Sequence, residues 1–341
     1  MGLKKAGFNV VAGVELNPKV AKTYEANNPG AQLIVKDIRQ VTGAEILKLT
    51  KLDSIDLVAG CPPCQGFSKL TDKYHRTDSR NGLVLEMARI IAELNPRMVM
   101  MENVPGLATR GKAILNKFME RLKAMGYCMN KDVLQMADYG VPQSRNRLVL
   151  LAGKGFEIPL PIPTYSIKGG KGGELKPWLT LEDAIKGMPN PVTLSKANSS
   201  GGPKNFNWHV ISDLTELNKN RLNALNQGGS RKGLPKKLRP KCHETNDGFK
   251  NVYGRLSWTQ TPPTMTSGFT RLSMGRFGHP DELRTLSVRE AALIQTFPMS
   301  YKFETEFMST ACELVGNALP CVFATKVAKS CLIAFKEQCG T

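Results

Sequence analysis

The sequence predicts an α/β protein in which a doubly wound, mostly parallel Rossmann-like sheet is accompanied by a smaller, loop-rich domain. Three observations support this prediction. Through the first half of the chain, short apolar segments alternate with amphipathic ones, a pattern typical of β-α-β units around a parallel sheet. Near residue 155 the composition shifts toward Pro, Gly, Asn and Lys, and the periodicity weakens. A regular apolar pattern returns at residues 287–296, where we expect the chain to re-enter the larger domain.

The expected elements of the larger domain follow in chain order. Residues 10–16 form the first expected strand, and Asn17-Pro18 caps and opens a helix that ends near residue 28. The other elements are strands at residues 32–38, 54–60, 97–104, 127–136 and 147–153, a helix at 82–94 and a final helix at 319–337. We therefore assign residues 1–158 and 286–341 to this domain.

Residues 159–285 form the expected smaller domain. Two runs in it, at residues 168–173 and 231–241, are turn-rich and basic. Such a region is either plain solvated loop or a recognition domain built from loops. The sequence leaves both interpretations open for parts of it.

The net charge of the 341-residue chain is +18 at pH 7. Because mixed-charge surfaces usually come out near neutral, this excess indicates a polyanionic partner. Charge alone does not separate DNA from RNA. A merely soluble basic protein is the alternative interpretation.

The eight cysteines are scattered, and only Cys61 and Cys64 form a close pair. In a chain of this length they resemble reduced intracellular thiols rather than a disulfide framework. Without a second C-x-x-C pair, we expect no metal site. We also see no secretory signal, and no apolar run that approaches the roughly 20 residues needed to cross a bilayer. A cytoplasmic protein without a membrane contact is expected.

Polar or reactive residues follow four successive expected strands. Glu15, Asp37, the Cys61–Cys64 turn and Glu102-Asn103 each stand where a strand ends. In open parallel sheets, ligands bind at the carboxyl ends of the strands. Carboxylates at Glu15 and Asp37 suit a nucleoside, because they can accept hydrogen bonds from ribose hydroxyls and from an adenine amino group.

The segment 60–68, Gly-Cys-Pro-Pro-Cys-Gln-Gly-Phe-Ser, is the most specific motif in the chain. It resembles the Pro-Cys-Gln nucleophile loop of the cytosine carbon-5 methyltransferases. The resemblance continues in the family's order and spacing through the motifs at residues 78–82, 101–104, 139–147, 289–298 and 316–320. It implies a DNA methyltransferase that uses S-adenosylmethionine, with residues 159–285 as its target recognition domain.

The resemblance implies that Cys64 is the nucleophile. Carbon 5 of cytosine is too poor a nucleophile to attack a methyl sulfonium directly, whereas a thiolate added at carbon 6 makes an enamine-like ring whose carbon 5 can attack. Glu102 is expected to bond ring nitrogen 3 and the exocyclic amine, and so to stabilise the charge that develops. Arg145 and Arg147, two apart on an extended segment, are expected to point the same way. In the family this pair serves the base oxygen and the catalytic loop.

The family pattern also assigns partners and binding residues. Duplex DNA with a specific cytosine target is the expected partner, and the chain is expected to act as a monomer. The cytosine must be flipped out, because its carbons 5 and 6 cannot be attacked inside a base stack. The expected DNA contacts are Ser68, Lys73, Arg76, Arg80, Gln143 and Thr264. The expected S-adenosylmethionine contacts are Glu15, Asp37, Ile38, Pro62, Leu83, Asn317 and Ala318.

The first residues depart from the family pattern. The family opens with a strand and a glycine-rich turn, Asp-x-Phe-x-Gly-x-Gly-Gly, that wraps the methionine end of the cofactor. The segment Met1–Phe8 matches the family just after that turn. Because the family's first strand is central in its sheet, we expect a gap with two unpaired edges, and weak cofactor binding.

Two alternative functions stay open. An RNA cytosine methyltransferase would share the catalytic motifs, although the long basic region at residues 160–285 favours DNA. A non-catalytic DNA-binding protein is suggested by the unmatched glycine-rich turn, although Cys64, Glu102 and Arg147 are intact. A thioredoxin-like Cys61–Cys64 pair is disfavoured, since it has no use for the Glu-Asn-Val and Gln-x-Arg-x-Arg motifs. Incubation with labelled S-adenosylmethionine and either duplex DNA or tRNA separates these functions.

Overall fold

The computed structural model describes residues 1–63, 82–170, 173–240 and 251–340. They pack as two compact units, each of which is described by itself. The first unit holds Met1–Tyr139, Asn146–Pro163 and Val322–Thr341, and the second holds Gly140–Arg145 and Thr164–Cys321. The expected larger domain is therefore divided between the two units, because its residues 286–321 pack in the second unit. The functional boundaries of the recognition region stay a prediction.

The first unit contains the strands and helices that the alternating pattern predicts, with ends that differ by a few residues. Asn17 caps α2 as expected, because its side chain accepts a hydrogen bond from the Lys19 N–H at 3.0 Å and Pro18 begins the helix. The main elements are α1 (Gly2–Ala6), β1 (Ala12–Glu15), α2 (Pro18–Asn27), β2 (Gln32–Val35), α3 (Gly43–Thr50), β3 (Leu57–Gly60), α4 (Leu83–Leu94), β4 (Met98–Asn103), α5 (Gly106–Thr109), α6 (Lys112–Ala124), β5 (Tyr127–Gln135), β6 (Asn146–Lys154) and α12 (Cys321–Cys339).

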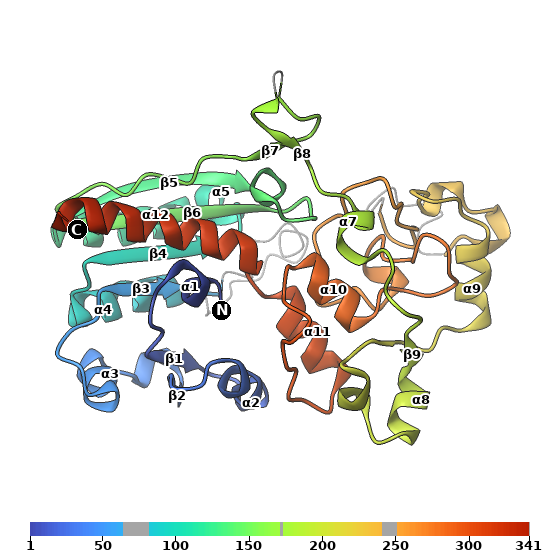
Figure 1. Cartoon of the computed structure of the whole chain (residues 1–341), viewed down its shortest axis with the longest axis horizontal. Helices are drawn as coiled ribbons and strands as arrows, with labels where there is room; N and C mark the ends of the chain where they lie inside the picture. The colour runs from blue at the N-terminus through green and yellow to red at the C-terminus, as the bar shows by residue number, and fades with distance from the viewer. Residues whose placement is uncertain (64–81, 171–172, 241–250, 341) are drawn as a thin grey trace. The chain divides into compact units, whose positions relative to one another are not determined.

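These strands form two separate sheets. β1 pairs with β2 in parallel, and a four-stranded sheet has the order β3-β4-β6-β5 (Figure 1). β3 and β4 are parallel, whereas β6 runs antiparallel to both β4 and β5. The α/β fold is confirmed, and the sheet is mixed. Only residues 136–145 connect β5 to β6, which is shorter than the crossover of about a dozen residues or more that a parallel pair needs.

Among the described residues, the strands β1 and β3 are each paired on one side only. β1 pairs only with β2, and β3 pairs only with β4, within the part of the chain that the structure describes. A hydrophobic cluster spans the two sheets, since Ile34 of β2 and Ile90 of α4 are buried together and Val58 of β3 packs against them. The expected gap between these two edges stays a prediction.

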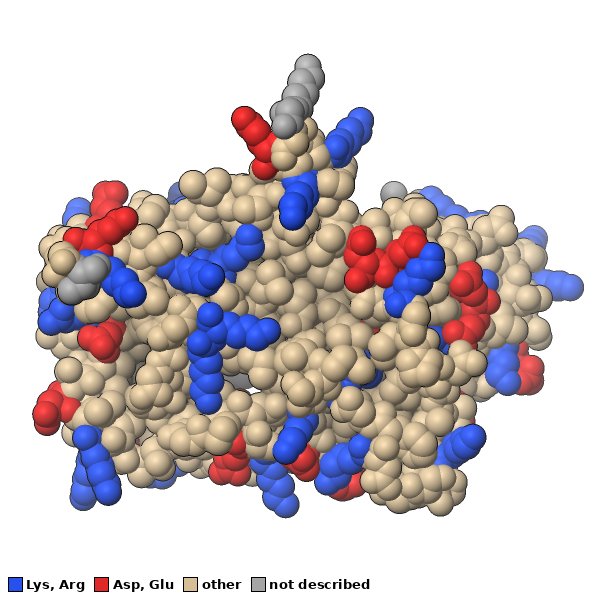
Figure 2. Space-filling view, viewed as in Figure 1, with Lys and Arg blue, Asp and Glu red and all other residues tan. Residues whose placement is uncertain are grey.

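Helices α1 and α12 pack closely and carry much positive charge. A Cβ atom on Gly2 would lie 2.4 Å from the Cβ of Ala324, so α1 approaches α12 at a distance that only glycine permits. Figure 2 shows lysine and arginine side chains gathered over these helices. The helices contribute a single acidic residue, Glu337, and the lysines Lys4, Lys5, Lys326, Lys329 and Lys336.

The segment Met308–Cys339 is long and apolar enough to cross a membrane by length and composition, with a mean hydropathy of 1.5. This corrects the expectation that no apolar run approaches that length. The structure interrupts the segment at residues 317–320 and divides it into α11 (Met308–Gly316) and α12. Phe323, Val327 and Cys331 of α12 are fully buried in the protein core. A buried core helix meets the same criterion, so the segment is weak evidence for a membrane contact.

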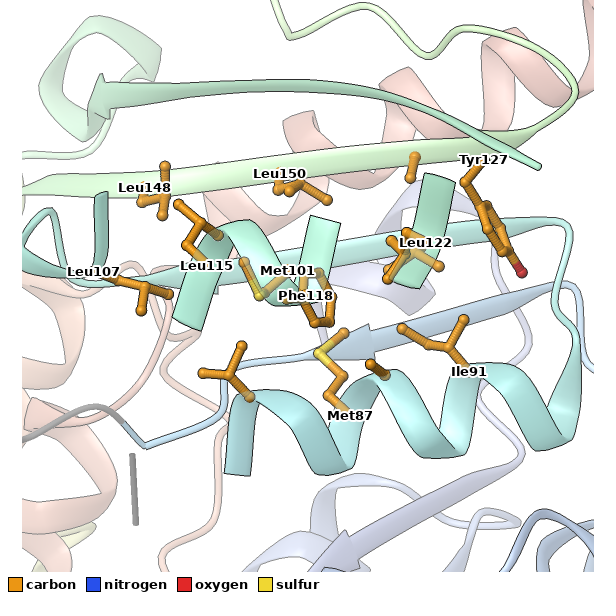
Figure 3. Close-up of a cluster of buried hydrophobic side chains, with 14 residues drawn as sticks. Met87, Ile91, Met101, Leu107, Leu115, Phe118, Leu122, Tyr127, Leu148 and Leu150 are labelled. Atoms are coloured by element: carbon orange, nitrogen blue, oxygen red, sulfur yellow. The ribbon is translucent and has the colours of Figure 1, made fainter. Parts of the chain in front are cut away.

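The main core of the first unit lies between the four-stranded sheet and helices α4 and α6 (Figure 3). Met87 of α4 and Phe118 of α6 point toward Met101 of β4, and Leu150 of β6 closes the cluster. All six residues of β4 are buried. The sheet is therefore anchored by apolar packing, and the residues at the end of β4 are held on a rigid strand.

The second unit has little regular structure, and its core combines buried apolar side chains such as Trp208 and Phe269 with buried polar ones. Arg289 is fully buried and donates to the Asn207 and Tyr301 carbonyl oxygens at 2.8 and 2.9 Å. Arg284 is paired with the buried Glu290 at 2.7 Å. The remaining elements are β7 (Tyr165–Ser166), β8 (Lys176–Pro177), α7 (Leu181–Ile185), β9 (Val192–Thr193), α8 (Leu194–Ser199), β10 (Val210–Ile211), α9 (Glu216–Asn223), α10 (Val288–Ile294) and α11.

Candidate active site

The carboxyl ends of the parallel strands carry the polar residues that the sequence places there. Glu15 is the last residue of β1, and Asp37 follows the end of β2. In the other sheet, Gly60 ends β3 opposite Met101, so Cys61 emerges beside Glu102 of β4. Ligands in such sheets bind at this edge.

Glu102 and Arg147 form an ion pair at the end of β4. Glu102 is 8% exposed, and its Oε1 lies 2.8 Å from Nε of Arg147. Glu102 is opposite Val149 in the antiparallel β4–β6 pair. Since side chains two apart on a strand share a face, Arg147 is the diagonal neighbour that a long side chain can reach. The strand register therefore sets the pair.

The surroundings of this pair have little access to water. Burial lowers the pKa of Arg147, and the Glu102 carboxylate opposes this change. Cys61 as a residue is exposed, but its thiol lies beside Glu102, and desolvation together with the Glu102 charge raises the pKa of Cys61 well above its ordinary value. Cys61 therefore stays a thiol at neutral pH and is a poor nucleophile.

Asn103 fixes the segment that leads to Cys64. It is 4% exposed, its Nδ2 donates to the Pro62 carbonyl oxygen at 3.0 Å, and its Oδ1 accepts from the Val104 N–H at 2.9 Å. The chain is thus tied to β4 two residues before the expected nucleophile. The positions predicted within residues 64–81 lie outside the described residues, namely Cys64, Ser68, Lys73, Arg76 and Arg80.

Arg145 has different partners from Arg147. Its guanidinium is buried in the second unit, where Nη1 donates to the Met265 carbonyl oxygen at 2.9 Å and Nη2 to that of Gly316 at 3.3 Å. From their spacing, the two arginines were expected to point the same way from one extended segment. Arg145 instead precedes β6 and belongs to a stretch that bridges to Pro263 through Ser144. Its contacts are those of a residue that holds the backbone in place.

Gln143 is also an internal residue in this structure. Its side chain is fully buried, with Nε2 donating to Oε1 of Gln295 at 2.8 Å and Oε1 accepting from the Met265 N–H at 2.8 Å. Gln295 in turn donates to the Val315 and Ala318 carbonyl oxygens. This geometry does not support the predicted DNA contact of Gln143, because both ends of its amide are used inside the protein.

The Gln143–Gln295 amides lead to the turn that holds Asn317 and Ala318. Gly316 packs so closely on residues 266–267 that a Cβ atom there would lie 2.3 Å from the Ser267 nitrogen. Asn317 follows as the exposed cap residue of α11. Both predicted cofactor contacts therefore lie on a turn of the second unit that is fixed by close packing and by Gln295.

A groove in the second unit was not foreseen from the sequence. It has a volume of about 940 Å³, and Thr264 lies in its wall with Oγ1 donating to the Ser144 carbonyl oxygen at 2.9 Å. Trp178, Gln260 and Arg276 also line it. These residues come from loops that follow no periodic pattern, so composition indicated the region but not the individual side chains.

The residues at the ends of β1 and β2 fit the ribose and adenine of S-adenosylmethionine, the methyl donor that the family resemblance implies. Glu15 uses Oε1 to accept the Asn17 N–H at 2.8 Å, which leaves acceptor sites for ribose hydroxyls. Asp37 is hydrogen-bonded by Arg39, whose Nη2 lies 2.5 Å from Oδ2, and these bonds lower the pKa of Asp37 to about 2. A ligand amine would share that carboxylate with Arg39. Of the expected apolar contacts, Ile38 directly follows Asp37, Pro62 follows β3 and Leu83 begins α4, and all three are half-buried.

Comparison with known proteins identifies similar sequences. The pattern of the family described as C-5 cytosine-specific DNA methylase matches residues 1–332. A Type II methylase of Herpetosiphon aurantiacus, M.HgiDII, is 36% identical over 96% of this chain and 90% of its own length. A Type II methyltransferase of Haemophilus parahaemolyticus, M1.HphI, is 30% identical over 97% of this chain and 83% of its own length.

Solved structures share the fold. A proposed DNA modification methyltransferase encoded within an E. coli prophage has a TM-score of 0.73 and 22% identity, and the match covers 98% of this chain and 95% of that one. The S. pombe Dnmt2 methyltransferase has a TM-score of 0.63 and 18% identity, and the match covers 100% and 95% of the two chains. At these identities the likeness shows the α/β fold alone.

Proposed function

We propose, since this chain belongs to the C-5 cytosine-specific DNA methylase family, that it methylates a flipped-out cytosine in duplex DNA through a covalent adduct with Cys64. The family membership makes it a DNA cytosine-5 methyltransferase. S-adenosylmethionine would supply the electrophilic methyl group. The use of this donor, the covalent route and the roles of individual residues are our proposals.

The observation that carries the proposal is the buried Glu102–Arg147 pair at the end of β4. When the Cys64 sulfur bonds to carbon 6, the electron pair of the 5,6 double bond would move to the bond between carbons 4 and 5, and negative charge would develop on nitrogen 3. Glu102 would bond nitrogen 3 and the exocyclic amine, and would stabilise the charge there. Arg147 holds the Glu102 carboxylate in one orientation. Carbon 5 would take the methyl group as the donor leaves as its thioether, S-adenosylhomocysteine. Loss of the proton on carbon 5 would then expel the Cys64 thiolate and restore the 5,6 double bond.

Arg145 and Gln143 would act as positioning residues in this scheme. They bond the Met265 backbone, and Arg145 also bonds that of Gly316. These bonds fix the backbone at Met265 and Gly316, and so they would hold the neighbouring residues Thr264 and Asn317 in place. This support is consistent with a DNA contact at Thr264 and a cofactor contact at Asn317.

The charge of the chain supports a nucleic-acid substrate. The net charge of +18 suits the phosphate backbone, which dominates affinity for nucleic acid. We propose that the protein acts as a cytoplasmic monomer on duplex DNA. An RNA substrate remains the second candidate from the sequence, and the description of the matching family favours DNA.

The test is methyl transfer from labelled S-adenosylmethionine to duplex DNA or to tRNA. We expect label in carbon 5 of cytosine in the DNA and none in the tRNA. Label in tRNA alone would replace the DNA proposal with the RNA one. Specific duplex binding without any methyl transfer would indicate a non-catalytic DNA-binding protein.

A further inference from the structure

The groove of the second unit brings together two side chains of the kinds that recognise purine bases. Arg276 and Gln260 both line this groove of about 940 Å³. Arginine donates two hydrogen bonds to N7 and O6 of guanine, and glutamine pairs with N6 and N7 of adenine in the major groove. The groove therefore carries side chains of the two types that read purine edges.

The Arg276 side chain packs against two glycine residues, Gly254 and Gly228. Its stem lies so close to Gly254 that a Cβ atom there would be 2.7 Å from Cγ of Arg276. Its Nη1 donates to the Gly228 carbonyl oxygen at 3.2 Å. Gly228 has a φ of 75°, in the left-handed region that favours glycine. The arginine is therefore held by its stem and by one of its five N–H groups.

The rest of the guanidinium group is left to donate elsewhere. Nε of Arg276 is buried and has no hydrogen-bond partner among the described residues. A buried donor without an acceptor is destabilising, so an acceptor supplied by a ligand would satisfy it. The Nε atoms of Arg145, Arg255 and Arg284 share this state, but among these four arginines Arg276 is the one that lines the groove.

Gln260 approaches the same glycine. Its Nε2 lies 3.4 Å from the position that a Cβ atom of Gly228 would take, and the residue is exposed to the groove. The Arg276 guanidinium group and the Gln260 amide group thus lie next to the same glycine, Gly228. Two adjacent groups that read base edges fit neighbouring base pairs better than they fit a phosphate, which carries no sequence information.

We infer that this groove reads duplex DNA in the major groove and that Arg276 recognises a guanine of the target sequence. The inference rests on the proposed function, since it assumes duplex DNA as the substrate. Arg276 is a specificity-determining residue in this assignment, and Gln260 reads the adjacent base pair. Because its stem and Nη1 are already held, the Arg276 side chain loses little rotamer freedom on binding. This favours a fixed hydrogen-bonded pair with a base over a loose contact with phosphate.

The experiment selects duplexes from a pool randomised around a central cytosine, using the full chain with S-adenosylmethionine present, and sequences the bound fraction. Wild type should enrich a site with guanine at one position. Arg276→Ala should lower the preference for guanine there by about 5-fold to 100-fold, with other positions less affected. Arg276→Lys keeps the stem and the charge but lacks the fork, so it should lose the same preference even if the alanine variant is unstable.

Arg271→Ala is the matched control, because Arg271 is an exposed arginine of the same unit outside the groove wall. It removes the same charge and should weaken binding equally for all sequences. The inference fails if Arg276→Ala behaves like Arg271→Ala, or if both Arg276 variants keep the guanine preference. If wild type enriches and methylates no duplex at all, the proposed function itself fails. Methylation of an enriched site that ignores Arg276 overturns the base-reading role alone.

Discussion

The active-site edge of the first unit and the groove of the second unit are built in different ways. Glu102 and Asn103 end a strand whose six residues are all buried, and the register with β6 brings Arg147 to Glu102. Arg276 and Gln260 stand on loops that are shaped by glycines and by buried polar bonds. The first region stands on a strand that is packed by apolar side chains, whereas the second stands on loops in which hydrogen bonds accompany the apolar packing. The proposed chemistry stands on a regular strand, whereas the proposed base-reading surface stands on loops, where side chains can vary most freely.

The largest effect is expected from Cys64→Ser. A hydroxyl is a far weaker nucleophile than a thiolate at neutral pH, so methyl transfer should fall by about 10⁴-fold or more. DNA binding should stay near that of wild type, since phosphate contacts lie elsewhere. Trapping on duplex DNA that contains 5-fluorocytosine would be measured by a gel shift under denaturing conditions. A covalent adduct that persists in the Cys64→Ser variant would show that Cys64 is not the nucleophile.

Arg284→Met tests the dependence of the second unit on polar bonds. The substitution leaves the buried Glu290 without its charge partner, and we expect a loss of about 3–5 kcal/mol in the free energy of unfolding. Phe118→Ala in the apolar core of the first unit should lose a similar amount, about 3–5 kcal/mol. Urea titrations of both variants, with Arg271→Met as an exposed control, would measure the two losses.

The same two variants should differ in their response to pH. Burial alone would raise the pKa of Glu290, but the hydrogen bonds from Arg284 outweigh it, and the pKa lies below the ordinary value of 4.5. The unfolded state therefore binds more protons, so the stabilisation is present above about pH 4.5 and is lost as the pH falls through the folded-state pKa. The loss caused by Arg284→Met should shrink in acid, whereas that of Phe118→Ala should not. Equal pH profiles would contradict the contrast between the units.

Glu102→Gln should lower turnover by about 10²-fold or more while changing DNA affinity little. The amide can still bond the base but cannot carry the negative charge. Single-turnover rates and binding constants, measured on one duplex, separate the two quantities. Equal losses in rate and affinity would assign Glu102 a contact made already in the ground state.

The smallest effect is expected at Arg39. Arg39→Ala removes an exposed ion-pair partner of Asp37. A bound nucleoside would then no longer compete with Arg39 for the Asp37 carboxylate. Exposed pairs contribute little, so cofactor affinity should rise by at most about fivefold. Calorimetry with S-adenosylmethionine would measure it, with Lys36→Ala as a control that breaks the exposed Lys36–Glu45 pair. A fall in affinity specific to Arg39→Ala would place Arg39 itself against the cofactor.

Sequence reasoning predicted the first unit well because its elements follow simple periodicities. The cap at Asn17 and the strand that ends with Glu102 and Asn103 were both expected, and both are present. The mixed direction of the sheet was missed, because connection lengths and not periodicity decide it. The helices α3 and α6 were also left unassigned.

Within the site, the strand ends were predictable, whereas the environment of each side chain was not. Nothing in the spacing of Arg145 and Arg147 indicates that one bonds backbone carbonyl oxygens and the other a carboxylate. Gln143 matched a family motif, and only packing shows that its amide is buried. The groove around Arg276 depends on glycine contacts between distant loops, which leave no periodic signal in the chain.

The arrangement of the two sheets has a consequence for local stability. The amides of β4 lie between two hydrogen-bonded neighbours, and all six residues are buried, so they should exchange with solvent deuterium only on global unfolding. β1 is bonded on one side only among the described strands, and its residues are half-buried, so its amides should exchange through cheaper local openings. Glu102 is thus attached to the slowest-exchanging part of the unit and Glu15 to a faster one. The protein would hold the reacting base on a rigid support, and ordering of the strand beside Glu15 would accompany nucleoside binding.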